Sequence, residues 1–448
     1  MKLSVGLGLI SNKFNPKEDY KSDTVLIGAG GFVLGLRSHP LEADLLYCFT
    51  DVGGAYRFDP INESWILITK FPFFEGSPGH QYGIEDLALD PSNPDIVYIS
   101  SGKYATQGVK GDFLKSTDKG NTWTKLGLDV YIGANHSHRR TGPMIQISPH
   151  DNNHIVVATH HEGIWITFNG GQNTGDWVQA NLIPCTPYIQ FSSWHVAKAI
   201  RAIWIDLIDP DVVYACLSDL TYTLFNGTVV RPYLTEDAGL YKSTDKGITW
   251  TKVPSQPTGL TRVNKITQSP NGTIWITHTT GFCKFNPTTG EFTDYNNTTL
   301  GINSTGFGGI AVSPFDPLEV TVFTLGNWGK QRIFRTTDEG STWNEIVYTY
   351  ETMPWSTPSP NARYTPTETA DCTYNRHIPS NKPDELYFST WFAVYKSTNT
   401  RSNSPHFNLL IKHIELLVTL GLFCPPKQED YNIPPLISGH ADLGAYVH

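Results

Sequence analysis

The feature that most constrains the fold is a short motif that occurs three times. The segments STDKGNTWTKL from Ser116, STDKGITWTKV from Ser243 and TTDEGSTWNEI from Thr336 share one order of Ser or Thr, Asp, Gly, Thr and Trp. This is the pattern of the Asp box, in which the carboxylate can accept backbone N–H groups of a hairpin turn, Gly permits a positive φ, and Trp packs beneath the hairpin. Because a catalytic group is not normally supplied once per repeat, we interpret each of these Asp residues as structural.

A second periodic signal surrounds the boxes. A turn such as Asp-Pro or Ser-Pro precedes a β-rich run, as in DPSNPDIVYIS and SPFDPLEVTVFT, and seven such units occur between Ser38 and about Thr400. The spacing of roughly fifty residues suits four short strands with their turns. The 39 Gly, 30 Pro and 12% aromatic residues agree with many turns and half-buried sheets. The sequence therefore predicts an all-β protein with a seven-bladed β-propeller over residues 20–400 and little helix.

The two ends of the chain differ from this pattern. Residues 1–19 form a leader in which Lys2 precedes a short apolar run, which makes a poor signal peptide. After residue 400 the repeats stop, and residues 401–448 are expected to form a connector. The last segment, LISGHADLGAYVH, resembles LYCFTDVGGAYRF in the first predicted blade. We therefore expect the chain to start a second, truncated propeller and to stop after its first strand.

Charge and hydropathy exclude two classes of partner. The formal net charge of -9, without any block of Lys and Arg, argues against nucleic acid, whose phosphates require clustered cations. No stretch approaches the roughly 18 apolar residues that span a bilayer, so no membrane segment is expected. The six cysteines are widely spaced, which permits one or two disulfides and indicates no metal site.

Seven Asn-x-Ser/Thr sequons fall in predicted turns. They favour an extracellular, secreted glycoprotein, although no clear signal peptide is visible. The sequon residues are Asn62, Asn135, Asn226, Asn271, Asn296, Asn297 and Asn303.

Two Asp residues stand at equivalent positions of the first blade and the C-terminal segment. Glycoside hydrolysis needs two carboxyl groups facing each other across a sugar chain, one protonated and one ionised. Asp51 and Asp442 would meet if two tandem propellers faced each other. The alternative is that each Asp only caps a tight Asp-x-Gly turn.

Several motifs resemble one enzyme family in both order and spacing. They are IGAGGFVLGLRSHP, LLYCFTDVGGAYRFD, IEDLALDPSNPDIVYISSGKY, FLKSTDKGNTW and PPLISGHADLGAYVH, and together they span Tyr20 to His448. They resemble glycoside hydrolase family 74, the xyloglucan-cleaving endoglucanases and reducing-end-specific cellobiohydrolases. The Asp-Val-Gly-Gly-Ala-Tyr-Arg string is more specific to that family than the Asp boxes, which many propellers share.

The resemblance implies two seven-bladed propellers around an open cleft and cleavage of a β-1,4-glucan with inversion. It places the general base on Asp51 and the general acid on Asp442, with no metal or organic cofactor. Inversion requires carboxyl groups about 6.5–9.5 Å apart. This chain departs from the family pattern where Ala445 replaces a second Gly and Tyr446 replaces Phe, and in NHSHRRTGPM, where only part of a charged segment is kept.

Sugar rings present apolar C–H faces that stack on aromatic side chains. Four aromatic residues in loop-like contexts are therefore candidates for substrate binding, although packing between blades is the alternative for each. These are Tyr104, Trp328, Trp355 and Trp391.

The sequence thus favours a monomeric glycosidase that acts on xyloglucan or a related plant polysaccharide. The alternative function is a non-catalytic propeller that binds carbohydrate or peptide, either as an inactive relative of the hydrolases or as a sortilin-like module. Sialidases also carry Asp boxes, but this acidic chain lacks their Arg-Ile-Pro opening.

Overall fold

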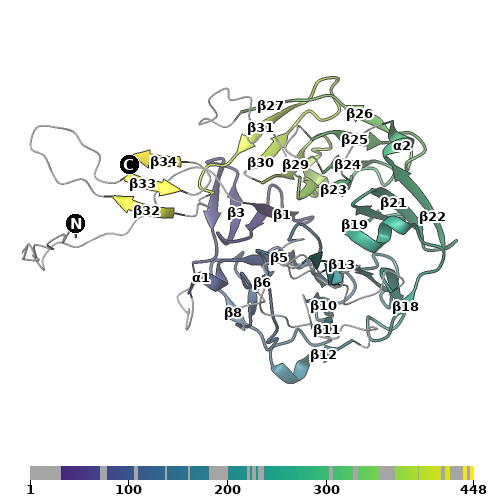
Figure 1. Ribbon diagram of the computed structural model, residues 1–448, viewed down its shortest axis with the longest axis horizontal. Helices are drawn as coiled ribbons and strands as arrows, with labels where there is room; N and C mark the ends of the chain where they lie inside the picture. Colours follow the sequence, from purple (N-terminus) through teal and green to yellow (C-terminus); the bar gives the residue numbers. More distant parts are fainter. Residues whose placement is uncertain are drawn as a thin grey trace, which may run out of the picture.

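Seven antiparallel sheets are arranged as blades around a common axis (Figure 1). The computed structural model describes residues 32–447 except for 71–77, 105–108, 137–138, 160–161, 181–199, 219–221, 224–228, 231–236, 302–305, 326–330, 353–368, 392, 415–418, 424–436 and 441–443. In each blade the strands pair in chain order, and the first strand lies nearest the axis. The predicted seven-bladed, nearly all-β propeller is confirmed.

Each blade contains four strands in up-and-down order. The first three blades are β1 (Val33–Ser38), β2 (Leu46–Thr50), β3 (Ala55–Asp59) and β4 (Ser64–Leu67); β5 (Ile84–Leu89), β6 (Val97–Ser101), β7 (Asp112–Ser116) and β8 (Thr124–Lys125); and β9 (Ile145–Ile147), β10 (Ile155–Ala158), β11 (Ile164–Thr167) and β12 (Val178–Gln179). The next two are β13 (Ile200–Ile205), β14 (Val213–Leu217), β17 (Gly239–Ser243) and β18 (Thr251–Lys252); and β19 (Val263–Gln268), β20 (Ile274–His278), β21 (Gly281–Asn286) and β22 (Glu291–Asn296). The last two are β23 (Phe307–Val312), β24 (Val320–Thr324), β25 (Ile333–Thr336) and β26 (Asn344–Ile346); and β28 (Asp371–Tyr374), β29 (Leu386–Ser389), β30 (Val394–Ser397) and β31 (His406–Leu410).

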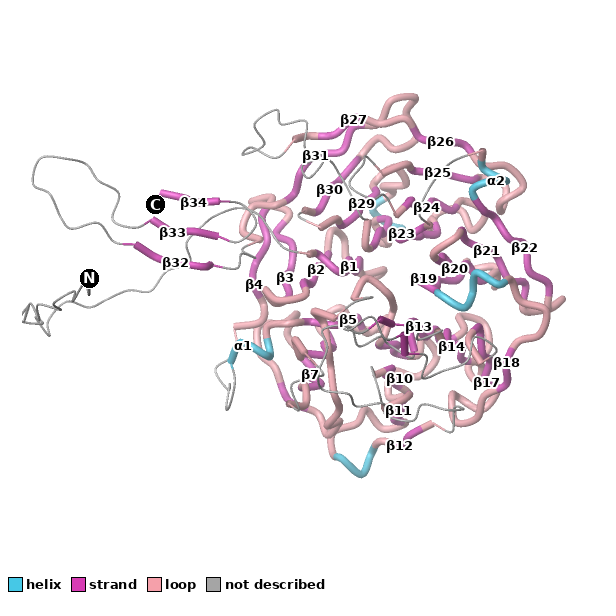
Figure 2. The backbone as a smooth tube through the Cα atoms, in the orientation of Figure 1, coloured by secondary structure: helices cyan, strands magenta, loops and turns pink. Residues whose placement is uncertain are grey.

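The remaining elements are short and lie outside the blades or at their edges (Figure 2). They include a two-stranded sheet of β15 (Tyr222–Thr223) and β16 (Val229–Val230), and β27 (Thr349–Tyr350), which runs parallel to β31. The helices within the described ranges are α1 (Pro78–Gln81), α2 (Asn297–Leu300) and three 3₁₀ turns at Thr174–Asp176, Thr258–Arg262 and Ile378–Ser380. A three-stranded sheet of β32 (Thr419–Phe423), β33 (Ile437–His440) and β34 (Gly444–Val447) lies outside the ring.

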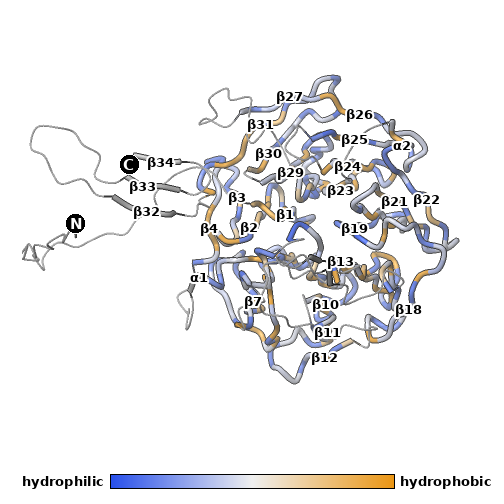
Figure 3. Tube along the Cα trace, in the orientation of Figure 1, coloured by the Kyte–Doolittle hydropathy of each residue, from blue (hydrophilic) through white to orange (hydrophobic). Residues whose placement is uncertain are grey.

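The hydrophobic core lies between neighbouring blades. Every residue of the second strands β2, β6 and β14 is buried, because both faces of each sheet pack against an adjacent blade. Between the first two blades, for example, Tyr47, Phe49, Ile84 and Ile99 belong to one apolar cluster. Figure 3 shows the result as hydrophobic stretches within the blades. Burial on both faces explains why these strands read as continuous apolar runs rather than as alternating patterns.

The ring closes between the first and seventh blades without a shared strand, since each of these blades is built from one continuous part of the chain. Backbone contacts join the two ends instead. The N–H of Val33 donates to the carbonyl of Thr390 at 3.3 Å, and that of Trp65 donates to Lys412 at 2.9 Å. The indole of Trp65 also donates to the carbonyl of Leu410 at 3.0 Å. Closure therefore depends on non-covalent contacts along this single boundary.

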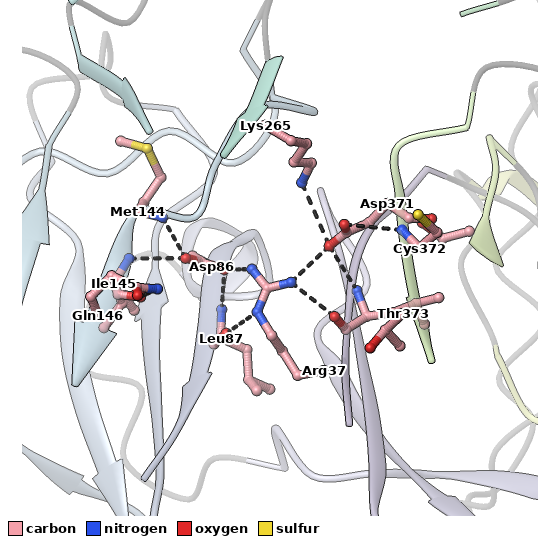
Figure 4. Close-up of polar contacts among 12 residues, drawn as sticks. Arg37, Asp86, Leu87, Met144, Ile145, Gln146, Lys265, Asp371, Cys372 and Thr373 are labelled. Atoms are coloured by element: carbon pink, nitrogen blue, oxygen red, sulfur yellow. Dashed lines mark hydrogen bonds and ion pairs between the residues drawn. The ribbon is translucent and has the colours of Figure 1, made fainter. Parts of the chain in front are cut away.

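A network of charges at the axis strengthens that boundary (Figure 4). Arg37 on β1 pairs with Asp86 on β5 at 2.6 Å and with Asp371 on β28 at 2.7 Å, and Lys265 on β19 lies 3.6 Å from the same Asp371. Both carboxylates are buried, and Asp86 also accepts the backbone N–H groups of Met144 and Ile145 at the start of the third blade. The innermost strands of four blades are thus joined by charge, and a fifth is attached by backbone hydrogen bonds.

The Asp boxes occupy the turns between the third and fourth strands of their blades. In the second blade, Asp118 accepts the N–H of Thr122 at 2.8 Å and its hydroxyl at 2.7 Å. Lys119 and Gly120 adopt positive φ values of 59° and 87°. In the equivalent box of the sixth blade, hydrogen bonds from Thr336 and Thr342 lower the pKa of Asp338 to about 2. The box carboxylates are thus used inside the turns, which is the structural role expected of them.

The ring extends beyond the boundary expected near residue 400. β31 (His406–Leu410) is the fourth strand of the seventh blade and pairs with β30. The polar segment before it resembles a linker but is a modified Asp box with Asn in place of Asp. Ser397 donates its hydroxyl to the side chain of Asn399 at 2.9 Å, and Asn399 in turn accepts the N–H of His406 at 3.1 Å. A neutral side chain thus accepts the hydroxyl and backbone hydrogen bonds of this turn, although its partner lies seven residues on rather than four as in the Asp boxes.

Candidate functional site

The turn between β2 and β3 contains the most specific sequence motif, Asp-Val-Gly-Gly. Thr50 fixes this turn, since its hydroxyl donates to the carbonyl of Gly54 at 2.9 Å and accepts the N–H of Gly53 at 2.9 Å. Gly54 has a φ of +94°, and a Cβ at this position would lie 2.1 Å from the hydroxyl of Thr69. Only Gly fits both constraints. The motif therefore holds Asp51 in one fixed position at the end of β2.

The carboxyl group of Asp51 is buried and charged groups surround it. The residue is 5% exposed, and its Oδ2 lies 3.1 Å from Nε of Arg139. Its Oδ1 is buried and has no hydrogen-bond partner among the described residues. Burial raises the pKa of Asp51 to about 6, against the opposing effects of Arg139 and Lys103. This side chain is an uncommonly basic carboxylate with one oxygen still able to accept a hydrogen bond.

Arg139 is held by two aromatic side chains, one from each side of the boundary where the propeller closes. Its guanidinium carbon lies 5.0 Å from the ring centre of Phe32, just before β1, and 5.3 Å from that of Trp391, between β29 and β30. The two rings meet edge to face at 4.9 Å. Such cation–π contacts fix the guanidinium in place. Closure of the propeller therefore brings together the aromatic pair that positions Arg139 beside Asp51.

A second group borders Asp51 on the side of the second blade. The hydroxyl of Tyr104 accepts the side-chain N–H of Asn135 at 2.8 Å, and its ring lies 5.9 Å from that of His136. Nζ of Lys103 lies 5.9 Å from the ring centre of Tyr104. These residues come from the β6–β7 loop and from the connection between the second and third blades. Blade-end loops thus assemble the site on one face of the propeller.

Of the six residues predicted from sequence, the structure places three in this region. Asp51 and Trp391 are joined through Arg139, and half-buried Tyr104 lies on the adjoining loop. The other three predicted residues, Asp442, Trp328 and Trp355, lie outside the described residues. The strands β33 and β34 that flank position 442 pair antiparallel, as β2 and β3 do around Asp51.

Sequence reasoning missed Phe32 and Lys103, and it gave Arg139 no role. Lys103 directly precedes Tyr104, and Arg139 lies in the segment NHSHRRTGPM that departs from the family pattern. The sequence signal for Lys103 and Arg139 is therefore limited to their position beside, or within, a segment that was already of interest.

Other expectations concern cysteines, metals and membranes. Four described cysteines, Cys48, Cys216, Cys283 and Cys372, are buried and free, so none of them forms a disulfide, while Cys185 and Cys424 lie outside the described residues. Within the described ranges, no group of three or more His, Cys, Asp or Glu side chains could hold a metal ion. No helix in the part of the chain that the structure describes is long and apolar enough to cross a membrane.

Comparison with curated proteins gives a consistent result. The chain is 30% identical over 482 residues to a xyloglucanase of Acetivibrio thermocellus, a match that covers 98% of this chain and 54% of that protein. It is 29% identical over 473 residues to a xyloglucanase of Paenibacillus sp, covering 97% of this chain and 44% of that protein. The chain thus spans about half the length of the curated relatives it matches. No protein-family model matches the chain.

Solved structures support the fold. The GH74 xyloglucanase of Xanthomonas campestris matches with a TM-score of 0.77 at 21% identity, over 94% of this chain and 59% of that one. The GH74 enzyme of Niastella koreensis matches with a TM-score of 0.74 at 22% identity, over the same shares of the two chains. Together with the curated relatives, these matches confirm the resemblance found in the motifs: the chain is a homologue of the glycoside hydrolase family 74 xyloglucanases, matched over about half of their length.

Proposed function

We propose that the protein hydrolyses the β-1,4-glucan backbone of xyloglucan or a related plant polysaccharide by an inverting mechanism, with Asp51 as general base and Asp442 as general acid. The observation that carries this proposal is the state of Asp51, a buried carboxylate with a raised pKa and one oxygen without a hydrogen-bond partner among the described residues. It lies in the motif by which the chain resembles the hydrolases. The names of the curated relatives support the substrate.

In this mechanism Asp51 removes a proton from a water molecule as the water oxygen attacks the anomeric carbon. The bond from that carbon to the glycosidic oxygen breaks, and Asp442 gives its proton to the departing oxygen. The products are two shorter glucans, and the new hemiacetal has the inverted configuration. Asp51 then carries a proton that Asp442 lacks, and exchange with solvent restores both groups. No cofactor is needed.

The surroundings of Asp51 suit the role of base. A carboxylate with a pKa of about 6 accepts a proton more readily than an ordinary one, yet it is mostly ionised at neutral pH. Arg139, whose Nε lies 3.1 Å from Oδ2, stabilises the ionised form, and Oδ1, which has no hydrogen-bond partner among the described residues, is the oxygen that receives the proton from water. Burial and Arg139 therefore act in opposition to set the basicity of this group.

We further propose Tyr104 and Trp391, with Trp328 and Trp355, as side chains that contact the sugar chain. For Trp391 the ring surface open to a sugar is limited, because Arg139 and Phe32 already pack against it. A polysaccharide of this kind lies outside cells, so we propose an extracellular, monomeric enzyme. Exposed sequons at Asn62 and Asn271 agree with secretion.

Release of reducing sugar from xyloglucan tests the proposal. We expect activity in the unmodified protein and a loss of about 10²- to 10⁴-fold in Asp51→Asn and in Asp442→Asn, since each removes one proton-transfer group. Asp118→Asn, in an Asp box, is the matched control and should keep its activity. NMR of the first products should show the inverted anomer. Binding of xyloglucan without hydrolysis would instead identify a carbohydrate-binding propeller.

A further inference from the structure

Lys103 occupies a fixed position beside the candidate base. Its carbonyl accepts the N–H of Asn135 at 3.0 Å, and the preceding Gly102 donates to Gly83 at 2.7 Å and accepts from Ala134 at 2.8 Å. The β6–β7 loop is therefore held between the connections that precede and follow the second blade.

The loops of Lys103 and Asp51 are in direct contact through Gly83. A Cβ at Gly83 would lie 2.7 Å from Cα of Lys103 and 2.8 Å from the carbonyl oxygen of Asp51. Any side chain at Gly83 would therefore force these two segments apart. This close approach places Lys103 next to the carboxylate that we propose as the base.

The side chain of Lys103 is half-buried, and its ammonium group makes no ion pair among the described residues. No carboxylate, carbonyl or hydroxyl oxygen of the described residues lies within hydrogen-bond or ion-pair distance of its Nζ, and its described neighbour is the ring of Tyr104. Burial lowers the pKa of Lys103, against the attraction of Asp51. In contrast, Lys119 and Lys382, which are also partly buried, pair with Glu42 and Asp44 at 2.6 Å. The three N–H groups of this ammonium are therefore available to a ligand that binds over Asp51.

We infer that Lys103 donates a hydrogen bond to a hydroxyl oxygen of the sugar unit bound beside Asp51. This inference rests on the proposed function, because it assumes that a glycan binds over Asp51. A neutral hydroxyl is the expected acceptor, because the substrate of the proposed function is an uncharged glucan. Lys103 is thus a substrate-binding residue rather than a proton donor.

The test measures binding separately from hydrolysis. The Asp51→Asn variant is titrated calorimetrically with xyloglucan oligosaccharides, alone and combined with Lys103→Met, Lys103→Gln or Lys103→Arg. Loss of a hydrogen bond from a charged donor should weaken binding about 10- to 100-fold in the Met and Gln variants. The Arg variant, which keeps the charge and the donors, should lose less. Lys110→Met is the matched control and should bind normally, since this lysine is exposed and pairs with Asp129.

The outcomes separate the two proposals. If Asp51→Asn binds no oligosaccharide, the proposed function itself fails. If it binds the sugar and the Met and Gln variants bind equally well, the role of Lys103 is refuted. Preferential binding of uronic-acid oligosaccharides by the lysine-containing protein would also refute it, because the acceptor would then be a carboxylate. Thermal unfolding of each variant establishes that it is folded before binding is compared.

Discussion

Removing the charge of Arg139 should make Asp51 more basic and move the activity of the enzyme to higher pH. The structure places Nε of Arg139 3.1 Å from the carboxylate, and its attraction lowers the pKa that burial raises to about 6. An opposite charge at this distance is worth about 1–3 pH units. In Arg139→Met, the acid limb of kcat/KM should therefore move upward by that amount, because only the ionised carboxylate can act as the base. At pH 6 this corresponds to a loss of roughly 5- to 500-fold, recovered as the pH rises.

The assay is kcat/KM on xyloglucan between pH 4.5 and 8.5. Arg139→Lys, which keeps a positive charge but loses the planar stacking group, should give an intermediate profile. Arg332→Met removes an exposed arginine that pairs with Glu345 at 2.6 Å, and it serves as the control. An acid limb that stays in place or moves to lower pH in Arg139→Met would show that the guanidinium does not control the ionisation of Asp51. A uniform loss at every pH would show that Arg139 acts by packing alone.

Three further predictions concern stability. Asp51→Asn should be more stable than the unmodified protein at pH 7 by about 3 kcal/mol, because burial raises the pKa of Asp51 from 3.8 to about 6 and the folded protein must bear a buried charge above that pH. In denaturant unfolding, the difference in unfolding free energy should vanish as the pH falls from 6 to about 4. An equal difference at both pH values would exclude this cause. Arg37→Met should lower the unfolding free energy in denaturant titrations by about 3–5 kcal/mol, since it leaves Asp86 and Asp371 buried without their principal cation. A loss below about 1 kcal/mol would mean that Lys265 compensates for the missing charge. Gly54→Ala should lower both stability and activity, because the new Cβ would lie 2.1 Å from the hydroxyl of Thr69. Gly290→Ala is the control, since Gly290 has a similar positive φ of +74° but open space around a new Cβ. The difference between the melting temperatures of the two variants therefore measures the steric clash.

The architecture was predictable because the repeat is local. Each Asp box needs only a carboxylate, a Gly and a Trp within one turn, and seven Pro-marked strand starts gave the number of blades correctly. The end of the ring was less visible. In the seventh blade Asn399 acts as the acceptor at the position of the Asp, so the loop before β31 resembles a linker in sequence. A pattern defined by residue identity fails where a different side chain supplies the acceptor.

The candidate site was predictable only in part, for a related physical reason. Asp51 could be found because its turn is specified locally by Thr50 and Gly54. Arg139, Lys103 and Phe32 belong to loops of other blades, and no local pattern states which of these loops meet. Gly83 shows the difficulty. Its role is to let two backbones approach, which becomes apparent only when the distances of 2.7 and 2.8 Å to Lys103 and Asp51 are known.

The closure of the ring and the ionisation of Asp51 are linked by the same boundary. Trp391 from the seventh blade and Phe32 before the first blade hold Arg139, and the N–H of Val33, next to Phe32, donates to Thr390, next to Trp391. The ion pair of Arg37 with Asp371 fixes the same two blades at the axis. Loosening of this boundary should therefore move Arg139 away from Asp51, because each side of the boundary supplies one of the two rings that hold the guanidinium. The position of Arg139 beside Asp51 therefore depends on the boundary between the first and seventh blades.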